Sequence, residues 1–211
     1  MTMLQDKLDD ARQELIAIGS EFGQRRWAEA TSGNYSCVVD GQVLITASGR
    51  HKARLGLDDF VLLEADGTRV HSDDPPSSAE TQLHLELVQH AGAGAVLHAH
   101  TVWNTVLSHL HAPRGFIELS GWEMLKALPG IGTHETTVQL KIYDNTQDIP
   151  ALADDLRADL RSGALQVPGF LLRGHGLYAW GADLAAAHRH TEAFEFLLEV
   201  VGRLQSHEPR A

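Results

Sequence analysis

The chain has 211 residues, of which 43% are hydrophobic, and this is the size and composition of one globular domain with a substantial core. Its formal net charge of −11 argues against nucleic acid or an anionic membrane as the main partner, so an anionic substrate must be bound locally, by backbone N–H groups or a few cations. The single cysteine excludes an intramolecular disulfide, residues 1–10 lack the apolar core of a signal peptide, and no apolar run approaches a membrane span. We therefore expect a cytoplasmic protein with a single domain over residues 1–211.

The first part of the chain predicts a helix followed by two β-hairpins. Apolar residues three and four apart predict the helix over residues 4–22. The hairpins are expected over residues 35–46 and 60–71, and each turns at an Asp-Gly pair.

Two short Ser/Gly loops border the first hairpin. Ser32-Gly33-Asn34 precedes its first strand, and Ser48-Gly49 follows its second strand. Exposed amides and hydroxyls on such loops can bind a phosphate, although neither loop is a P-loop and an ordinary turn explains each composition equally well.

Two glutamates each stand three residues after a serine at a predicted helix start. Ser77 with Glu80 fits a capping box for a helix that runs to about His90, and Ser120 with Glu123 fits another. Each carboxylate therefore has a structural interpretation as part of a helix cap and a functional one as a group near a reactive centre.

A His-x-His sequence in the middle of the chain indicates a metal site. His98 and His100 follow an apolar strand over residues 95–97, and residues two apart on a strand point to the same side, where neutral imidazoles can chelate Zn²⁺. A catalytic zinc needs a third ligand and an open position. His175, between two glycines that relieve backbone crowding, is the candidate, although it could also be a turn histidine.

The second half of the chain alternates irregularly between helices and strands. Helices are predicted over residues 102–109, 149–161 and 183–204, and strands over 116–119, 138–142, 170–172 and 177–180. This order favours α/β layers around a mixed sheet.

The order of these motifs resembles the class II aldolase/adducin-like family over residues 8–204. The resemblance rests on five motifs in sequence: Ser32-Gly33-Asn34, Ser48-Gly49, Ser78-Ala79-Glu80, His98-Ala99-His100 and His175-Gly176-Leu177. It implies a three-layer α/β/α fold with a central mixed, largely antiparallel sheet. It also implies homotetramers with active sites near subunit boundaries.

The same resemblance implies the ligands of the site. One Zn²⁺ per subunit is expected at the positions matching His98, His100 and His175. The phosphate of a small sugar phosphate is expected at the positions matching Gly33, Asn34, Ser48, Gly49 and Ser78. Lys52 could assist, although a solvated surface lysine is an equal alternative.

Within the family, the chain is most similar to a branch that dehydrates a methylthio-substituted sugar phosphate in methionine salvage. The similarity lies in residues 92–100, 122–126, 144–146 and 175–181. Aldolases of the family use the position matching Glu80 as acid/base, together with a tyrosine near the C-terminus, and this chain has no tyrosine after Tyr178. The resemblance therefore implies Glu123 as the acid/base and leaves Glu80 supporting it. The alternatives are a sugar-phosphate aldolase or epimerase and a non-catalytic adducin-like interaction module.

Overall fold

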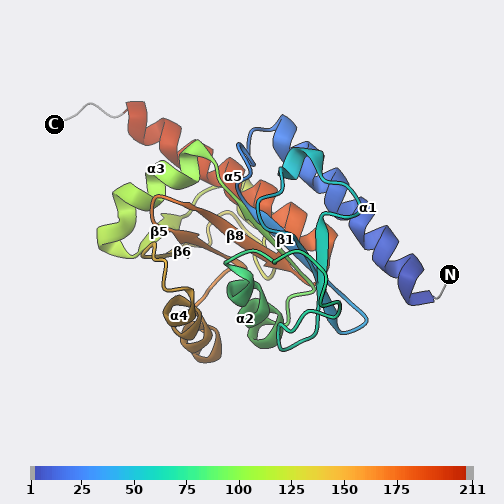
Figure 1. Cartoon of the computed structure of the whole chain (residues 1–211). Coiled ribbons are helices and arrows are strands. Elements are labelled where there is room, and N and C mark those ends of the chain that lie inside the picture. Colours follow the sequence, from blue (N-terminus) through green and yellow to red (C-terminus); the bar gives the residue numbers. More distant parts are fainter. Residues whose placement is uncertain (1–2, 208–211) are drawn as a thin grey trace.

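The computed structural model describes residues 3–207 and has a mixed β-sheet as its middle layer (Figure 1). The strand order in this part of the chain is β3-β2-β1-β4-β8-β7-β6-β5, and β6 and β7 are the one parallel pair of neighbours. The strands are β1 Asn34–Val39, β2 Gln42–Thr46, β3 Phe60–Leu63, β4 Ala95–Ala99, β5 Phe116–Leu119, β6 Val138–Tyr143, β7 Gly169–Leu172 and β8 Gly176–Gly181.

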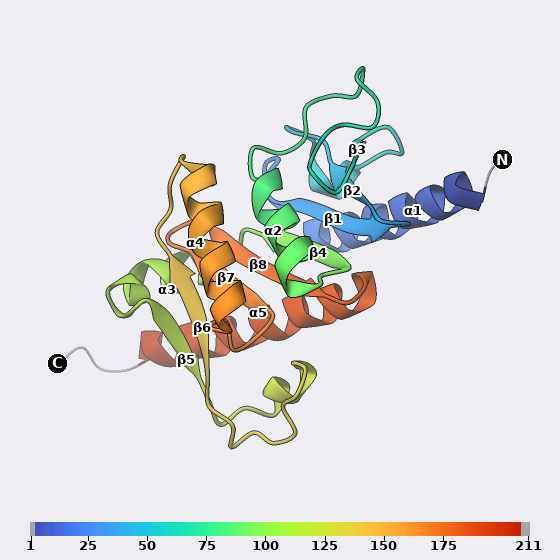
Figure 2. The same ribbon diagram turned by 90° about the horizontal axis from the view of Figure 1, so that it is seen from below.

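Helices cover both faces of the sheet, as Figures 1 and 2 show. One face carries α1 Met3–Gln24, α3 Val102–His111 and α5 Leu184–His207. The other carries α2 Thr81–Ala91 and α4 Ile149–Ser162. Three short 3₁₀ helices also form, η1 Lys52–Arg54, η2 Ala112–Arg114 and η3 Glu123–Ala127. The predicted three-layer α/β/α fold with a mixed, largely antiparallel sheet is confirmed.

The sheet is buried from both sides at its centre. All five residues of β4 and all six residues of β8 are buried. Strands covered on both faces read as continuous apolar runs, and this is how β4 appears in the sequence before its histidine. A buried His98 at the end of such a strand therefore needs a polar partner.

The long amphipathic helices agree with the sequence predictions, but two of the shorter predicted elements do not form. The expected second strand of the second hairpin is wrong, because Arg69 forms an isolated bridge to Leu63 and no ladder continues from it. The helix expected from Ser120 is also wrong. Ser120 Oγ accepts a hydrogen bond from Thr137 Oγ1, and only the short 3₁₀ helix η3 follows. No side-chain cap is formed at either end of η3, so the second capping box is absent.

The strand directions decide which strand ends lie at the same edge of the sheet. The end of β4 lies beside the start of β8, because Ala99 pairs with Leu177. The ends of β6 and β7 lie at the same edge, because β7 is antiparallel to β8 and parallel to β6. The end of β5 lies at the opposite edge, since Leu119 pairs with Val138 at the start of β6. Within residues 3–207, none of the helices combines the length and apolarity needed to cross a bilayer.

Candidate metal centre and phosphate pocket

Three histidines meet at the edge of the sheet where β4 ends and β8 begins. The distance from His98 Nε2 to His100 Nε2 is 2.8 Å, and from His98 Nε2 to His175 Nε2 it is 3.4 Å. His98 is the penultimate residue of β4, His100 directly follows the strand, and His175 lies in the turn between β7 and β8. The fold thus brings His175 to two histidines that precede it by more than 70 residues, as the two histidine motifs predicted.

Hydrogen bonds to the other ring nitrogen orient two of these imidazoles. His98 Nδ1 donates to the backbone oxygen of Leu177 at 2.9 Å, and His175 Nδ1 donates to Asn145 Oδ1 at 3.3 Å. Each ring therefore keeps its Nε2 lone pair free. Lone pairs that face one another at these distances repel, and a cation between them removes the repulsion.

Burial favours the neutral form of His98 and His100. It lowers the pKa of His98 well below its usual range and the pKa of His100 to about 4. The ring of Tyr178 stacks on that of His98, with centroids 4.0 Å apart, and closes the inner side of the centre. A neutral imidazole nitrogen is the form that binds a transition metal, so the donor set fits a divalent ion such as zinc.

Glu80 lies against this centre. Its carboxylate oxygens are 3.5 Å from His98 Nε2 and 3.5 Å from His175 Nε2. The predicted capping box is wrong, because α2 begins at Thr81 and Glu80 caps it with no side-chain hydrogen bond. Asn34 Nδ2 instead donates to Glu80 Oε2 at 2.7 Å. The carboxylate is thereby turned toward the histidines.

A cavity of about 290 Å³ adjoins the histidines and contains the predicted phosphate-binding positions. Its lining includes Gly33, Asn34, Ser48, Gly49, Lys52, Ser78, Glu80, His100 and His175. Gly33 has a φ of +76°, and a Cβ built on it would lie 2.4 Å from the backbone oxygen of His98. A residue with a side chain would therefore push the Ser32-Gly33-Asn34 loop away from β4.

Lys52 is a buried lysine of this cavity and is not a solvated surface residue. It is 2% exposed, and its Nζ donates to the backbone oxygens of Thr31 at 3.1 Å and Arg50 at 2.7 Å. Burial lowers its pKa to about 8, so it carries a positive charge at neutral pH. Of the described residues that line the cavity, Lys52 is the one lysine or arginine. The cavity thus has a single strong positive charge and amide-rich loops.

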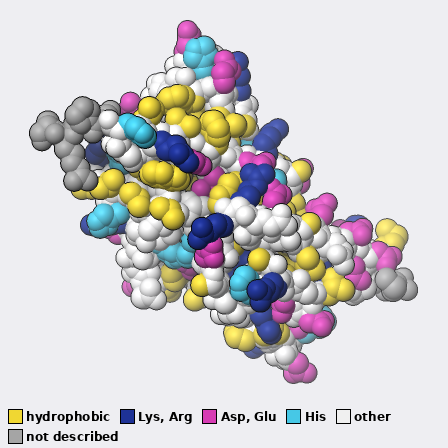
Figure 3. Space-filling view, turned by 90° about the horizontal axis from the view of Figure 1, so that it is seen from above, with side chains coloured by type: hydrophobic (Ala, Val, Ile, Leu, Met, Phe, Trp, Pro, Cys, Tyr) yellow, Lys and Arg dark blue, Asp and Glu magenta, His cyan; other side chains and the backbone are white. Residues whose placement is uncertain are grey.

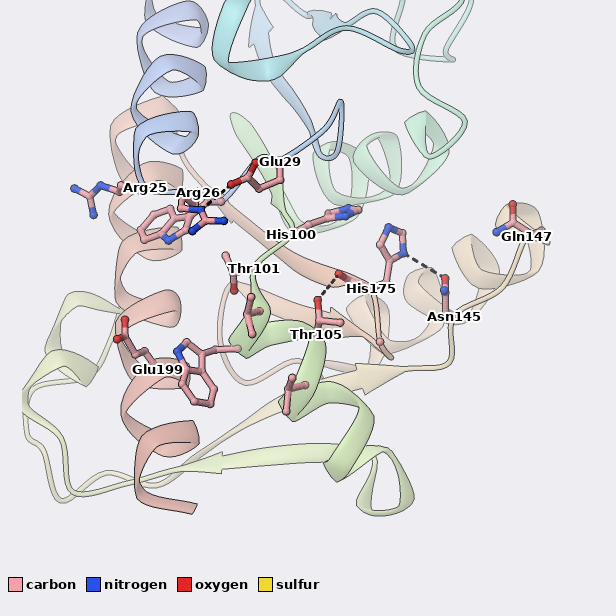
Figure 4. Close-up of a pocket in the computed structure, with 15 residues that line it drawn as sticks. Arg25, Arg26, Glu29, His100, Thr101, Thr105, Asn145, Gln147, His175 and Glu199 are labelled. Carbon is pink, nitrogen blue, oxygen red and sulfur yellow. Dashed lines mark hydrogen bonds and ion pairs between the residues drawn. The ribbon is translucent and has the colours of Figure 1, made fainter. Parts of the chain in front are cut away.

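A second and larger cavity, of about 840 Å³, opens on the other side of the histidines (Figure 4). It shares His100 and His175 with the first cavity, and its walls also include Trp27, Val102 and Val106. The candidate metal centre therefore stands between a polar pocket and a partly apolar one.

Glu123 lies far from the histidines within one chain. It belongs to η3, beyond the end of β5, at the edge of the sheet opposite the histidines (Figure 2). The six residues of β6 separate the two edges by roughly 15–20 Å. The Glu123 side chain is 68% exposed and pairs with Lys126 at 2.5 Å and His134 at 3.3 Å. The hydrogen bond from Lys126 lowers the pKa of Glu123.

Several residues of the site had no assignment from the sequence. Asn145 follows β6 and holds His175, and Tyr178 packs on His98 from β8. Asn145 could have been suspected because it closely follows β6, a strand that ends on the same side of the sheet as the three histidines. The buried pair of Ser36 and His84 had no signal, because neither stands in a recognisable motif.

Known proteins are similar to this chain in both sequence and fold. Residues 13–201 match the Class II Aldolase and Adducin N-terminal domain family. The chain is 48% identical to a methylthioribulose-1-phosphate dehydratase of Marinobacter nauticus, covering 90% of this chain and 91% of that protein. It is 47% identical to the protein of that name from Sorangium cellulosum, covering 88% of each.

Solved structures support the same fold at lower identity. An L-fuculose 1-phosphate aldolase superposes with a TM-score of 0.76 at 24% identity, covering 96% of this chain and 90% of that one. YgbL from Klebsiella pneumoniae, a putative aldolase/epimerase/decarboxylase, gives a TM-score of 0.79 at 22% identity, covering 97% and 94%. The predicted resemblance is confirmed, and the chain belongs to the class II aldolase and adducin N-terminal domain family.

Proposed function

We propose that this protein is a hydro-lyase that converts 5-methylthioribulose 1-phosphate to 2,3-diketo-5-methylthiopentyl 1-phosphate in methionine salvage. The observation that carries the proposal is the position of the three histidines, between a pocket suited to phosphate and a larger, partly apolar cavity. The names of the relatives at 47–48% identity support this substrate and reaction.

The phosphate occupies the smaller cavity. Lys52 supplies a positive charge there, and the loops at Gly33 and Gly49 supply backbone N–H groups. Ser48 and Ser78 add hydroxyl donors. These local groups bind an anion in a chain whose net charge of −11 would otherwise repel it.

His98, His100 and His175 hold one Zn²⁺ per chain. Three imidazole nitrogens are one fewer than the four ligands of a tetrahedral Zn²⁺, so a position would remain open for substrate. A divalent metal held there supplies Lewis acidity, which makes a proton beside a carbonyl group easier to remove.

The chain itself must supply a base and an acid. The base removes the proton from C3, and the acid protonates the C4 hydroxyl, which leaves as water. The resulting enol becomes the second ketone by tautomerisation, so the net change is the loss of one water molecule. We assign both proton transfers to Glu123, and we assign to Glu80 a supporting role at the histidines.

Glu123 then has to reach the site from a second copy of the chain, and a homotetramer with sites near its subunit boundaries provides this. Exposed apolar residues support such an assembly. Val102, Val106 and Leu110 are 73%, 41% and 60% exposed and form one stripe along α3. Phe196 and Leu204 are each 50% exposed on α5. Figure 3, which views this side of the molecule, shows hydrophobic side chains gathered near the C-terminal end of α5.

One observation favours a different reaction. Glu80 is 3.5 Å from two of the histidines, and the resemblance to the sugar-phosphate aldolases of the family implies this position as their acid/base. An adducin-like interaction module has less support, since a scaffold has no use for three converging imidazole lone pairs.

Identification of the product decides between these reactions. Incubation of the metal-loaded protein with 5-methylthioribulose 1-phosphate is expected to yield a product lighter by one water, detected by mass spectrometry. Two smaller fragments would indicate an aldolase, and an isomer of unchanged mass would indicate an epimerase. Either result would overturn the dehydratase proposal.

Replacement of a histidine is expected to remove the metal. His175→Ala loses one of three ligands, so metal content and turnover should fall together. The matched control is His188→Ala, because His188 lies with Glu21 and Glu192 in the other potential metal-binding cluster of the described residues. Arg25 pairs with both of those carboxylates at 2.7 Å, so we expect this control to keep its zinc. Metal analysis of both proteins is the test, and a His175→Ala protein with full zinc and full turnover would contradict the assignment.

Loss of the Lys52 charge is expected to weaken phosphate binding. Because its pKa is lowered to about 8, the wild-type affinity for inorganic phosphate should decline as the pH rises through 8. Lys52→Gln should bind phosphate about 10- to 100-fold more weakly at pH 7, the loss of one charge-assisted hydrogen bond, and should lack that pH step. Lys7, which is exposed and pairs with Asp40, gives the control Lys7→Gln. Competition against substrate between pH 6.5 and 9.5 measures this, and equal pH profiles in wild type and Lys52→Gln would count against the role of Lys52.

Exchange of subunits tests the role of Glu123. Glu123→Gln preserves shape but cannot shuttle a proton, so turnover should fall by about 10²- to 10⁴-fold, and Glu80→Gln should keep more activity. Glu135→Gln, an exposed change in the same connection, is the control. If equal amounts of Glu123→Gln and His175→Ala chains assemble at random, about a quarter of the sites receive both intact groups, and activity returns to that level. If the mixed assemblies recovered no activity and Glu80→Gln lowered turnover more than Glu123→Gln, the proton transfers would have to be assigned to Glu80.

A further inference from the structure

A chain of buried hydrogen bonds runs from β1 to the carboxylate of Glu80. Ser36 Oγ is 2.7 Å from His84 Nδ1, and His84 Nε2 is hydrogen-bonded to Asn34 Oδ1. Asn34 Nδ2 reaches Glu80 Oε2 at 2.7 Å. Ser36 and His84 are fully buried, and Asn34 is 4% exposed, so water does not compete for the hydrogen bonds among these three residues.

The direction of each hydrogen bond follows from its neighbour. Asn34 presents its amide N–H groups to Glu80 Oε2 and to Ser78 Oγ, which is 3.1 Å away. Its Oδ1 therefore faces His84, whose Nε2 must carry the proton. His84 Nδ1 is then an acceptor, and Ser36 Oγ donates to it. Burial lowers the pKa of His84 to about 3, so the ring has one N–H and not two.

This arrangement prevents rotation of the Asn34 amide. A half-turn would place Oδ1 against the carboxylate of Glu80 and would place Nδ2 against the Nε2–H of His84. Both contacts repel, and both would lie in a buried site where unsatisfied groups are costly. The ring of His84 also packs edge-on against Tyr178, 5.8 Å between centroids, and Tyr178 stacks on His98. The same histidine thus contacts both the wall behind the candidate metal centre and the amide that holds Glu80.

We propose that His84 is a positioning residue: its Nε2–H fixes the Asn34 amide, and the Asn34 amide holds the Glu80 carboxylate against the three histidines. Ser36 sets the ring tautomer that makes this possible. The hydrogen bonds in the protein support this inference directly, and the turnover and phosphate readouts below rest on the proposed function.

The first test observes the tautomer. Long-range ¹H–¹⁵N spectra of the histidine rings in the full chain should show His84 as the neutral Nε2–H form at pH 7. Ser36→Ala should shift the resonances of this ring, because the donor to Nδ1 is gone. An Nδ1–H tautomer in the wild type would overturn the proposal, as would a spectrum that Ser36→Ala leaves unchanged.

The second test compares two replacements of His84. Gln places an N–H close to the position of Nε2, whereas Phe fills the space without a donor. We expect His84→Phe to lower kcat/KM by about 10- to 100-fold and His84→Gln to recover most of that loss. The matched control is His190→Phe. His190 is also buried, but it belongs to α5 and its ring donates to the backbone oxygen of Trp180. A purely structural role for His84 predicts equal losses in His84→Phe and His84→Gln.

A double-mutant cycle separates positioning from simple destabilisation. If His84 acts through Asn34, His84→Phe should cost little further activity in an Asn34→Ala background, and additive losses would contradict the proposal. Inorganic phosphate provides a second readout, because Asn34 lines the phosphate cavity and His84→Phe should weaken phosphate binding in the folded protein. If the wild type does not turn over methylthioribulose 1-phosphate, the proposed function fails, and the ring spectra still decide the role of His84.

Discussion

The site depends on how closely β8 approaches β4. At Gly176 a Cβ would lie 2.5 Å from the backbone oxygen of Ala99, 2.7 Å from His98 Cε1 and 2.9 Å from His100 Cδ2. Only glycine permits this approach, so the expectation that glycines beside His175 relieve crowding is confirmed at Gly176. The pairing of the two strands fixes the backbone of His98 and delivers His175 from the adjoining turn. The geometry of the histidines is therefore a consequence of strand register and one small residue.

The second constraint is electrostatic. A chain with a net charge of −11 repels anions at long range. One buried lysine and two amide-rich loops line a cavity of about 290 Å³ and provide local groups that attract an anion. Lys52 is held by backbone oxygens and forms no ion pair in the described part of the chain, so its charge is available to a ligand. His100 stands beside it in its neutral form because burial disfavours the charged form. These features suit the pocket to an anion although the chain has a net negative charge.

The sequence predicts those parts of the protein that periodicity and spacing determine. The long helices, the central strands and the meeting of His98 with His100 follow from apolar patterns and from the alternation of side chains on a strand. The predictions of capping boxes at Glu80 and Glu123 were wrong. A serine three residues before a glutamate also occurs where no regular helix begins at the serine. The burial of Lys52 and the path from Ser36 to Glu80 depend on contacts between distant segments, and no local pattern encodes them.

We propose that three imidazole nitrogens hold a metal at the junction of the two cavities, and X-ray absorption spectroscopy of the zinc-loaded protein observes these ligands directly. The spectrum should show three nitrogen ligands at about 2.0–2.1 Å and the multiple-scattering pattern of imidazole. The same spectrum of His98→Ala protein should lose that pattern. Oxygen ligands alone in the wild type, or a spectrum that His98→Ala leaves unchanged, would show that the histidines do not bind the metal.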